Sequence, residues 1–251
     1  MKQLIITLFF IYPFLLAAQT SGEIVFTETV QFEIDLPEGM EQFKDKIPSS
    51  QNFQQVLLFN ESATIYKSLP MEDTEDNDIN MSDGSGQFQM QMKFDIPDNQ
   101  LYQDISTGKT VEKKDFMDKK FLINGEVKRY KWNITGTQKK ILNYTCQQAI
   151  YEDSLGKTIA WFTSQIPVSC GPASYAGLPG MILALDIDDG KQTILATKVE
   201  LKDLEKNAIK APKKGKKVTE EEFEKIVEAK TKELQEEFGG SGNMIIKVQG
   251  Q

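Results

Sequence analysis

The chain has 251 residues, of which 39% are hydrophobic and 26% charged, and this is enough for one globular domain with a sizeable core. It carries 29 Lys and Arg residues against 37 Asp and Glu residues, and the resulting net charge of -8 argues against nucleic acid as a partner. Because the chain has 0 His residues, Ser-His-Asp and Cys-His catalysis, His-ligated zinc and histidine pH switches are excluded.

The N-terminus has the three-part layout of a secretory signal peptide. Lys2 precedes an apolar run from Leu4 to Leu16, and Ala17 and Ala18 supply small residues for cleavage. The alternative is an N-terminal membrane anchor, but the run is shorter than the ~20 residues that a spanning helix needs. We therefore expect residues 1–18 to be removed, leaving a periplasmic or extracellular protein with no membrane span.

Residues 19–206 have the pattern of an antiparallel β domain. Apolar and polar residues alternate over 24–34 and again over 88–94, which predicts strands with one polar face. Shorter strands are predicted at 56–59 and 158–162. No helical period separates the strands, so the βαβ repeat of a parallel α/β fold is absent from the pattern.

Turn residues and shared faces place the remaining strands. Asn124-Gly125 follows the apolar run 121–123 and precedes a segment that reaches Trp132, which predicts a hairpin. Asp188-Asp189-Gly190 predicts a second turn. Three sets of residues are each predicted to share one strand face: Leu142, Tyr144, Cys146 and Ile150; Met181, Leu183, Leu185 and Ile187; and Leu195, Thr197, Val199 and Leu201.

Residues 207–251 differ in character from the rest of the chain. A basic linker over 207–217 leads to Thr219 and Glu222, which form a capping box for a helix of about 20 residues. An edge strand is predicted at 244–248. The expected fold is mainly β, an antiparallel curved sheet or open half-barrel, with one C-terminal amphipathic helix packed on it through Phe223, Ile226, Val227 and Leu234.

The two cysteines, Cys146 and Cys170, favour a disulfide in an exported protein, with two separate buried thiols or one functional thiol as the alternatives. Met90 and Met92 share a strand face and suggest a soft-metal site with Cys146, although aromatic residues on that face favour core packing. The acidic segment 72–83 departs from the spacing of a calcium-binding loop, so a solvated loop is expected. We expect neither a metal nor a cofactor.

The segment Gly177-Leu178-Pro179-Gly180-Met181-Ile182 resembles the signature of the GLPGLI family, a group of exported Bacteroidetes proteins that are uncharacterised. Other motifs that resemble this family occur in order over roughly residues 24–205. They are Leu58-Phe59-Asn60-Glu61-Ser62 with Tyr66; Trp132-Asn133-Ile134-Thr135 with Ile141, Tyr144, Cys146 and Ala149; and Ala160-Trp161-Phe162-Thr163 with Ile166-Pro167 and Gly171-Pro172. The resemblance implies export but no established activity.

The signature lies in a loop rich in proline and glycine. Pro167, Pro172 and Pro179 fix φ, whereas Gly171, Gly177 and Gly180 allow conformations that other residues avoid, so a rigid loop is expected. Such a loop serves either to turn the chain between strands or to hold Tyr175 and backbone N–H groups at a binding site. The candidate ligand-binding residues are Trp161, Tyr175, Leu183, Leu142 and Tyr144.

These observations favour an exported, non-enzymatic envelope protein that binds an apolar or amphipathic ligand, with a lipid as the expected type. The alternatives are a module that docks on another envelope protein and, less favoured, a Met/Cys soft-metal binder. An enzyme is the least supported class, because Ser169 and Tyr175 have no partner residues that suggest a catalytic site.

Overall fold

The computed structural model describes residues 20–31, 48–70, 78–82, 89–93, 98–154 and 156–238. The predicted signal peptide, most of the acidic segment 72–83 and the predicted strand at 244–248 lie outside the described residues. Within the described part of the chain, no helix combines the length and the apolar character needed to cross a membrane.

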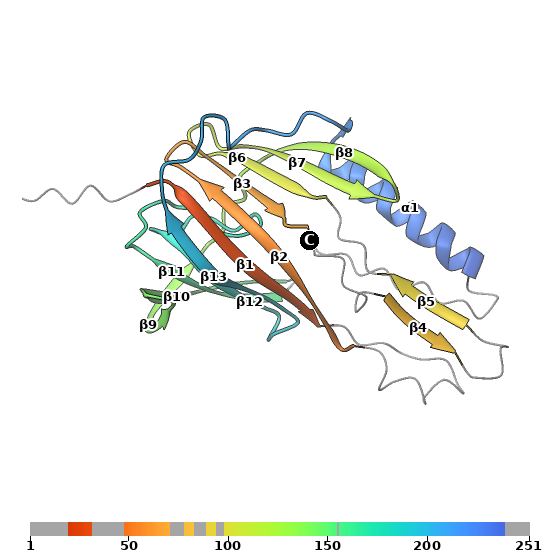
Figure 1. The fold of residues 1–251 in the computed structure, drawn as a ribbon, viewed down its shortest axis with the longest axis horizontal. Coiled ribbons are helices and arrows are strands. Elements are labelled where there is room, and N and C mark those ends of the chain that lie inside the picture. The colour runs from red at the N-terminus through yellow and green to blue at the C-terminus, as the bar shows by residue number, and fades with distance from the viewer. Residues whose placement is uncertain are drawn as a thin grey trace, which may run out of the picture.

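The predicted fold class is confirmed: the protein is mainly β, with a single open sheet and one C-terminal helix in the described residues (Figure 1). The main sheet contains β1 Gly22–Gln31, β2 Ser50–Phe59, β3 Ala63–Ser68, β6 Gln100–Asp104, β7 Lys109–Phe116, β8 Lys119–Glu126, β9 Asn133–Ile141, β10 Tyr144–Asp153, β11 Gly156–Thr163, β12 Met181–Ile187, β13 Gln192–Leu201 and β14 Lys216–Val218. A separate two-stranded sheet contains β4 Asp78–Ser82 and β5 Gln89–Lys93, and helix α1 spans Glu220–Phe238.

The strand order shows that the sheet is strongly curved. The order is β14-β8-β7-β6-β3-β2-β1-β13-β12-β11-β10-β9, and every pairing is antiparallel except that of β14 with β8. Nine strands lie between β8 and β9. A flat sheet would therefore separate these two strands by about 48 Å, whereas the connection 127–132 spans at most about 25 Å. The sheet must curve until its two ends approach each other.

The main core fills this curved sheet. It contains inward-facing residues of the central strands together with residues of the segment between β11 and β12, among them Ile24, Phe26, Leu57, Phe59, Phe162, Leu183, Leu185, Ile166, Val168 and Leu178. Strand β12 is buried along Met181–Leu185, which is unusual for an antiparallel sheet with one solvated face. Both faces of this strand are therefore covered.

The hairpin predicted at Asn124-Gly125 is wrong. Both residues lie inside β8, and Gly125 pairs with Thr110 of β7. The turn between β7 and β8 is instead Met117-Asp118, with φ of 48° and 58°. A two-residue turn of this type needs positive φ at both central positions, and here Met117 and Asp118 adopt it without a glycine.

The shared face predicted for Leu195, Thr197, Val199 and Leu201 is interrupted by a β-bulge. Val25 pairs with Lys198 and Phe26 with Ala196, so Thr197 is left without a partner across the ladder. The buried residues before the bulge are Ile194 and Ala196, whereas Leu195 is 47% exposed. The extra residue moves the following side chains to the other face of the sheet.

The predicted capping box is confirmed at the start of α1. The Glu222 backbone N–H donates to Thr219 Oγ1 at 3.1 Å, and the Thr219 N–H donates to Glu222 Oε2 at 2.8 Å. Phe223 packs edge-to-face on Phe121, with 5.3 Å between ring centroids, and Ile226 and Val227 contact the same small cluster. The helix therefore covers the β7–β8 end of the sheet, while the Leu234 side chain lies outside the description.

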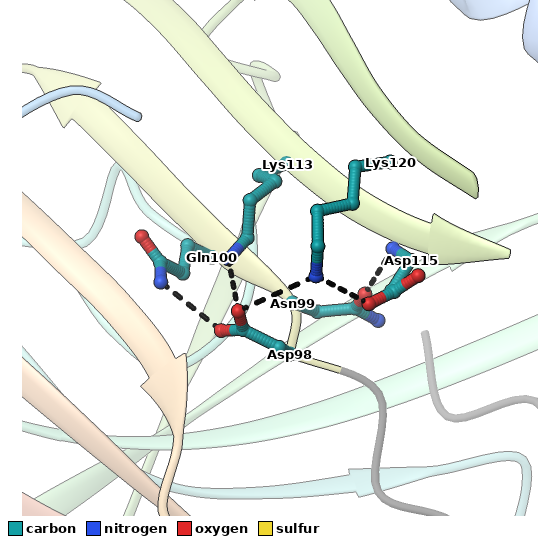
Figure 2. Close-up of polar contacts among 6 residues, drawn as sticks. All are labelled: Asp98, Asn99, Gln100, Lys113, Asp115 and Lys120. Carbon is teal, nitrogen blue, oxygen red and sulfur yellow. Dashed lines mark hydrogen bonds and ion pairs between the residues drawn. The ribbon is translucent and has the colours of Figure 1, made fainter. Parts of the chain in front are cut away.

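A polar cluster holds Asp98 and Asn99, the two residues before β6, against the β7–β8 hairpin (Figure 2). Lys113 Nζ, on a buried side chain, donates to Asp98 Oδ2 at 2.5 Å, and the Asp115 N–H donates to Asn99 Oδ1 at 2.9 Å. Lys120 Nζ lies 2.8 Å from Asp115 Oδ2 and 3.8 Å from Asp98 Oδ2. Burial raises the pKa of Asp98, but the bonds from Lys113 and a neighbouring glutamine outweigh it and the net pKa is lowered. The buried Lys113 side chain thus reaches a carboxylate that is itself open to solvent.

Candidate functional site

The segment 166–180, which we call the signature loop, folds back on itself and onto β12. Val168 N–H donates to the carbonyl oxygen of Ile166, and Cys170 N–H to that of Val168, each at 2.9 Å. Further along, Met181 N–H donates to Ile166 O at 3.1 Å. These short-range bonds satisfy part of the loop backbone, and three prolines fix φ within it.

Side chains of the signature loop alternate between core and surface. Buried members are Ile166, Val168, Cys170, Gly171, Pro172, Ala176, Leu178 and Gly180, and exposed ones are Pro167, Ser169, Gly177 and Pro179. The loop therefore contributes to the core as a strand would, while it also presents a narrow row of residues to solvent.

Two signature glycines are required for different reasons. Gly180 has φ of 145°, and a Cβ there would lie 2.1 Å from the Thr163 carbonyl oxygen. Gly177 has φ of 93°, and a Cβ there would meet only Trp132, at 4.0 Å. The first position needs glycine for space and conformation, the second for conformation alone.

Four aromatic residues, which we call the aromatic clasp, join the signature loop to the connection 127–132. The clasp consists of Tyr130, Trp132, Tyr151 and Tyr175, all half-buried. Tyr130 and Tyr175 stack with 4.8 Å between centroids, and Tyr151 meets Tyr130 edge-on at 5.1 Å. Trp132 Nε1–H donates to the Ala176 carbonyl oxygen at 2.9 Å. The clasp thus fixes the connection that links the two ends of the curved sheet.

The clasp offers ring surfaces and hydroxyl groups but no base. Burial raises the pKa of Tyr130 to about 12, and burial also raises the pKa of Tyr175. The hydrogen bond from Tyr151 to Asp153 Oδ2, at 2.7 Å, raises the pKa of Tyr151. All three phenols are therefore neutral near pH 7.

The five predicted ligand-binding residues do not gather at one opening. Leu183 is 0% exposed in the core, whereas Leu142 is 46% exposed in the turn between β9 and β10, with φ of 51°. Trp161 lies under Lys139, whose Nζ is 4.0 Å from the ring centroid. Tyr175 belongs to the clasp and Tyr144 is half-buried at the start of β10. Because a side chain with no accessible surface borders no space large enough for water, Leu183 lines no cavity.

Both cysteines are free and buried, which differs from the predicted disulfide. Cys146 Sγ lies 3.8 Å from the Tyr144 carbonyl oxygen, and Cys170 Sγ lies 3.7 Å from Met181 Sδ. Each sulfur is thus packed against a neighbour on its own segment of the core. Burial raises the pKa of Cys146 to about 11 and that of Cys170 well above the ordinary thiol range, so neither is a thiolate at neutral pH.

The soft-metal hypothesis joins residues of two different sheets. Met90 and Met92 lie on β5, opposite Met81 and Ile79 of β4, whereas Cys146 lies on β10 of the main sheet. Among the described residues, no group of three or more His, Cys, Asp or Glu side chains is placed to hold a metal ion.

The sequence did not single out Tyr130, Tyr151 or the exposed edge strand β9. Tyr130 meets Tyr175 only because the sheet curves, and a pattern of local alternation carries no information on that contact. The nearest signal was the spacing of Tyr130 and Trp132, two residues apart, which places both rings on one side of an extended segment.

The fold is an open, mainly antiparallel sheet with one C-terminal helix in the described residues, and similar architecture occurs in solved structures. Two structures of PNGF-II, in space groups C2 and P21, superpose with TM-scores of 0.53 and 0.52, each at 14% sequence identity. The matches cover 82% and 83% of this chain but only 32% and 33% of PNGF-II, so this chain spans about a third of that protein's length. At this identity the likeness shows the fold alone.

Residues 153–184 match a protein family described as "Protein of unknown function (Porph_ging)". The matched segment contains β11, the whole signature loop and the first part of β12. No curated protein matches the sequence. The family match thus falls on the loop that the clasp holds in place.

Proposed function

We propose that this protein is an exported, non-enzymatic member of the GLPGLI group that docks on another protein of the cell envelope. The docking face comprises the signature loop and the β9–β10 hairpin. Contacts at their borders bring the two parts together: Trp132, just before β9, donates to the Ala176 carbonyl oxygen of the loop, and the Thr145 N–H of β10 donates to Gln165 Oε1, just before the loop, at 2.9 Å. The signal-peptide pattern and the family resemblance support export.

One observation carries this proposal: two of the three most exposed large apolar side chains in the described residues lie on the β9–β10 hairpin. Ile134 and Leu142 are each 46% exposed there, whereas the third, Leu195, is 47% exposed on β13. By contrast, Met181 and Leu183 are 0% exposed. Large exposed apolar residues at an edge favour contact with a partner, whereas a filled core leaves an apolar ligand no space.

Site-specific photo-crosslinking in the producing cells tests the proposal. A benzophenone amino acid replaces Ser169 or Pro179, which are exposed on the signature loop, and the control replaces Lys119, which is exposed at the β7–β8 turn. We expect both loop positions to link to the same envelope protein, and the purified pair to bind in vitro. No crosslink, or equal crosslinking from Lys119, would contradict the proposal.

Native mass spectrometry of the exported protein tests the competing function. A co-purified lipid, lost in the Leu183→Trp variant, would favour the apolar-ligand hypothesis instead. We expect the mass of the bare mature chain, because Leu183 borders no cavity.

A further inference from the structure

Strand β9 is an exposed edge of the main sheet. It pairs with β10 on one side, and no described strand lies on its other side. Every residue from Asn133 to Lys140 is exposed. Such an edge presents backbone N–H and C=O groups to which another extended chain can bind.

The hairpin geometry shows which backbone groups face outward. Ile141 and Tyr144 flank a two-residue turn and are therefore a hydrogen-bonded pair. Because bonded and non-bonded pairs alternate along an antiparallel ladder, the N–H and C=O groups of Lys140 and Gln138 point away from β10. Nearer the start of β9 the pairing shifts by a bulge opposite Gln147–Ala149, so the regular free edge is Gln138–Ile141.

The charge around this edge differs from that of the whole chain. Residues 127–151 contain no Asp or Glu, although the net charge of the chain is -8. The same stretch carries five cations, Lys128, Arg129, Lys131, Lys139 and Lys140. Among the ion pairs of the described residues, none involves any of these five. Lys128 and Lys139 lie over the rings of Tyr130 and Trp161, and all five cations keep a positive charge that an ion pair does not neutralise.

An alternative explanation is that the lysines and the bulge only prevent edge-to-edge aggregation. That explanation accounts for Lys139 and Lys140, but it does not account for two other observations. The other three cations lie before the strand, where they protect no edge. Ile134 and Leu142, at 46% exposure each, are residues that a purely protected edge would lack. A cationic edge with apolar ends repels basic chains and selects an acidic one.

We propose that the Gln138–Ile141 edge of β9 binds an extended, acidic segment of the partner protein as an additional strand. Backbone bonds to Gln138 and Lys140 supply the pairing. Carboxylates on the added strand meet Lys139 on one face and Lys140 on the other, since successive side chains of β9 point to opposite faces. Apolar residues of the segment contact Leu142 beyond the pairing region. This inference rests on the proposed function and specifies the chemistry of the partner.

Fluorescence anisotropy with two synthetic peptides tests the inference. The first is a labelled peptide of about eight residues that repeats Val-Val-Glu-Glu, so that both faces of the added strand carry carboxylates, and the second has Lys in place of each Glu. We expect the acidic peptide to bind the mature protein, with weaker binding as salt rises from about 50 to about 300 mM, and the basic peptide not to bind.

Two variants separate backbone pairing from charge. Gln138→Pro removes an outward N–H and keeps all five cations, and Lys139→Glu with Lys140→Glu reverses two charges. We expect each to weaken binding of the acidic peptide at least about tenfold. The matched control, Lys213→Glu with Lys214→Glu, makes the same charge change in the exposed linker and should bind as the wild type does. Thermal unfolding midpoints check that all variants remain folded.

Three results would overturn the inference: no binding of the acidic peptide to the wild type, unchanged binding by Gln138→Pro, or binding of anionic phospholipid vesicles in its place. The last would assign the cations to a membrane surface. If crosslinking from Ser169 still identifies a partner while the peptide does not bind, the proposed docking function stands and only the strand-addition inference fails. If both fail, the docking function itself is wrong.

Discussion

Replacing Gly180 with alanine should destabilise the protein far more than replacing Gly177, although both belong to the same signature. Each has positive φ, at 145° and 93°, where an L-residue is strained. Only at Gly180 does the added Cβ collide with backbone, since it would lie 2.1 Å from the Thr163 carbonyl oxygen and 2.7 Å from its carbonyl carbon.

The expected magnitudes follow from these contacts. At Gly177 the cost is conformational, about 1–2 kcal/mol, because the nearest atoms to the new methyl group lie at 4.0 Å. At Gly180 there are two costs: the same conformational cost, and a cost of about 1–3 kcal/mol for overpacking. The overpacking arises because the new methyl group meets the backbone of Thr163 at the end of β11. We therefore expect a loss of about 2–5 kcal/mol for Gly180→Ala, a large share of the stability of a typical domain.

Urea unfolding of the mature protein, followed by tryptophan fluorescence, measures both variants. Trp132 in the clasp and Trp161 on β11 both lie near the loop, so the signal reports the region that is changed. An equal loss of stability in the two variants would refute the reasoning, because it would mean that the loop adapts and the close approach to Thr163 carries no cost. A loss larger at Gly177 would refute it as well.

Three further predictions follow from buried groups. Thiol reagent at pH 8 should label neither Cys146 nor Cys170 in the native protein and both after denaturation, whereas a disulfide would leave both unlabelled. Burial raises the pKa of Glu28 above its ordinary value of 4.5, and a hydrogen bond from Gln192 offsets this only in part. Protonated Glu28 therefore contributes free energy of folding below pH 4.5, and this contribution is lost as the pH rises through the pKa of Glu28 in the folded protein. Glu28→Gln should therefore unfold at higher urea than wild type at pH 8 and at similar urea at pH 4, and a wild-type advantage at pH 8 would contradict this. Ile226→Asp should cost about 2–4 kcal/mol by placing a charge against the β7–β8 cluster, and an unchanged midpoint would mean that α1 stands free.

Local patterns predicted the elements that depend on neighbours in sequence. The alternation over 24–34 corresponds to β1 at Gly22–Gln31, and the capping box at Thr219 corresponds to the observed start of α1. In both cases the determining contacts lie within a few residues, so the sequence contains the physical cause directly.

Predictions failed where a distant contact decides the local conformation. Asn124-Gly125 has the composition of a hairpin turn, but Gly125 remains extended because its strand pairs with β7 through Thr110. Likewise, the bulge at Thr197 arises from the register with β1, a strand about 170 residues away, and no alternation within β13 indicates it. Leu183, chosen as a candidate ligand residue from the alternation of its own strand, belongs to the main core cluster, which local alternation does not reveal.

The signature loop shows why composition alone is a weak guide to a site. Its prolines and glycines suggest a surface built for binding, yet Gly171 and Gly180 are glycines because backbone and side-chain atoms of the core lie within 3 Å of the missing methyl group. The loop packs on β12 and the clasp joins it to the connection 127–132, and these contacts require no ligand.

If this packing is the main role of the loop, the capacity to bind a partner lies in what the packing leaves open. The open part is the outer edge of β9, where no described strand pairs with the backbone, the lysines form no ion pair with a described residue, and Ile134 and Leu142 face solvent. Function is therefore best sought beside the motif rather than in its most characteristic residues.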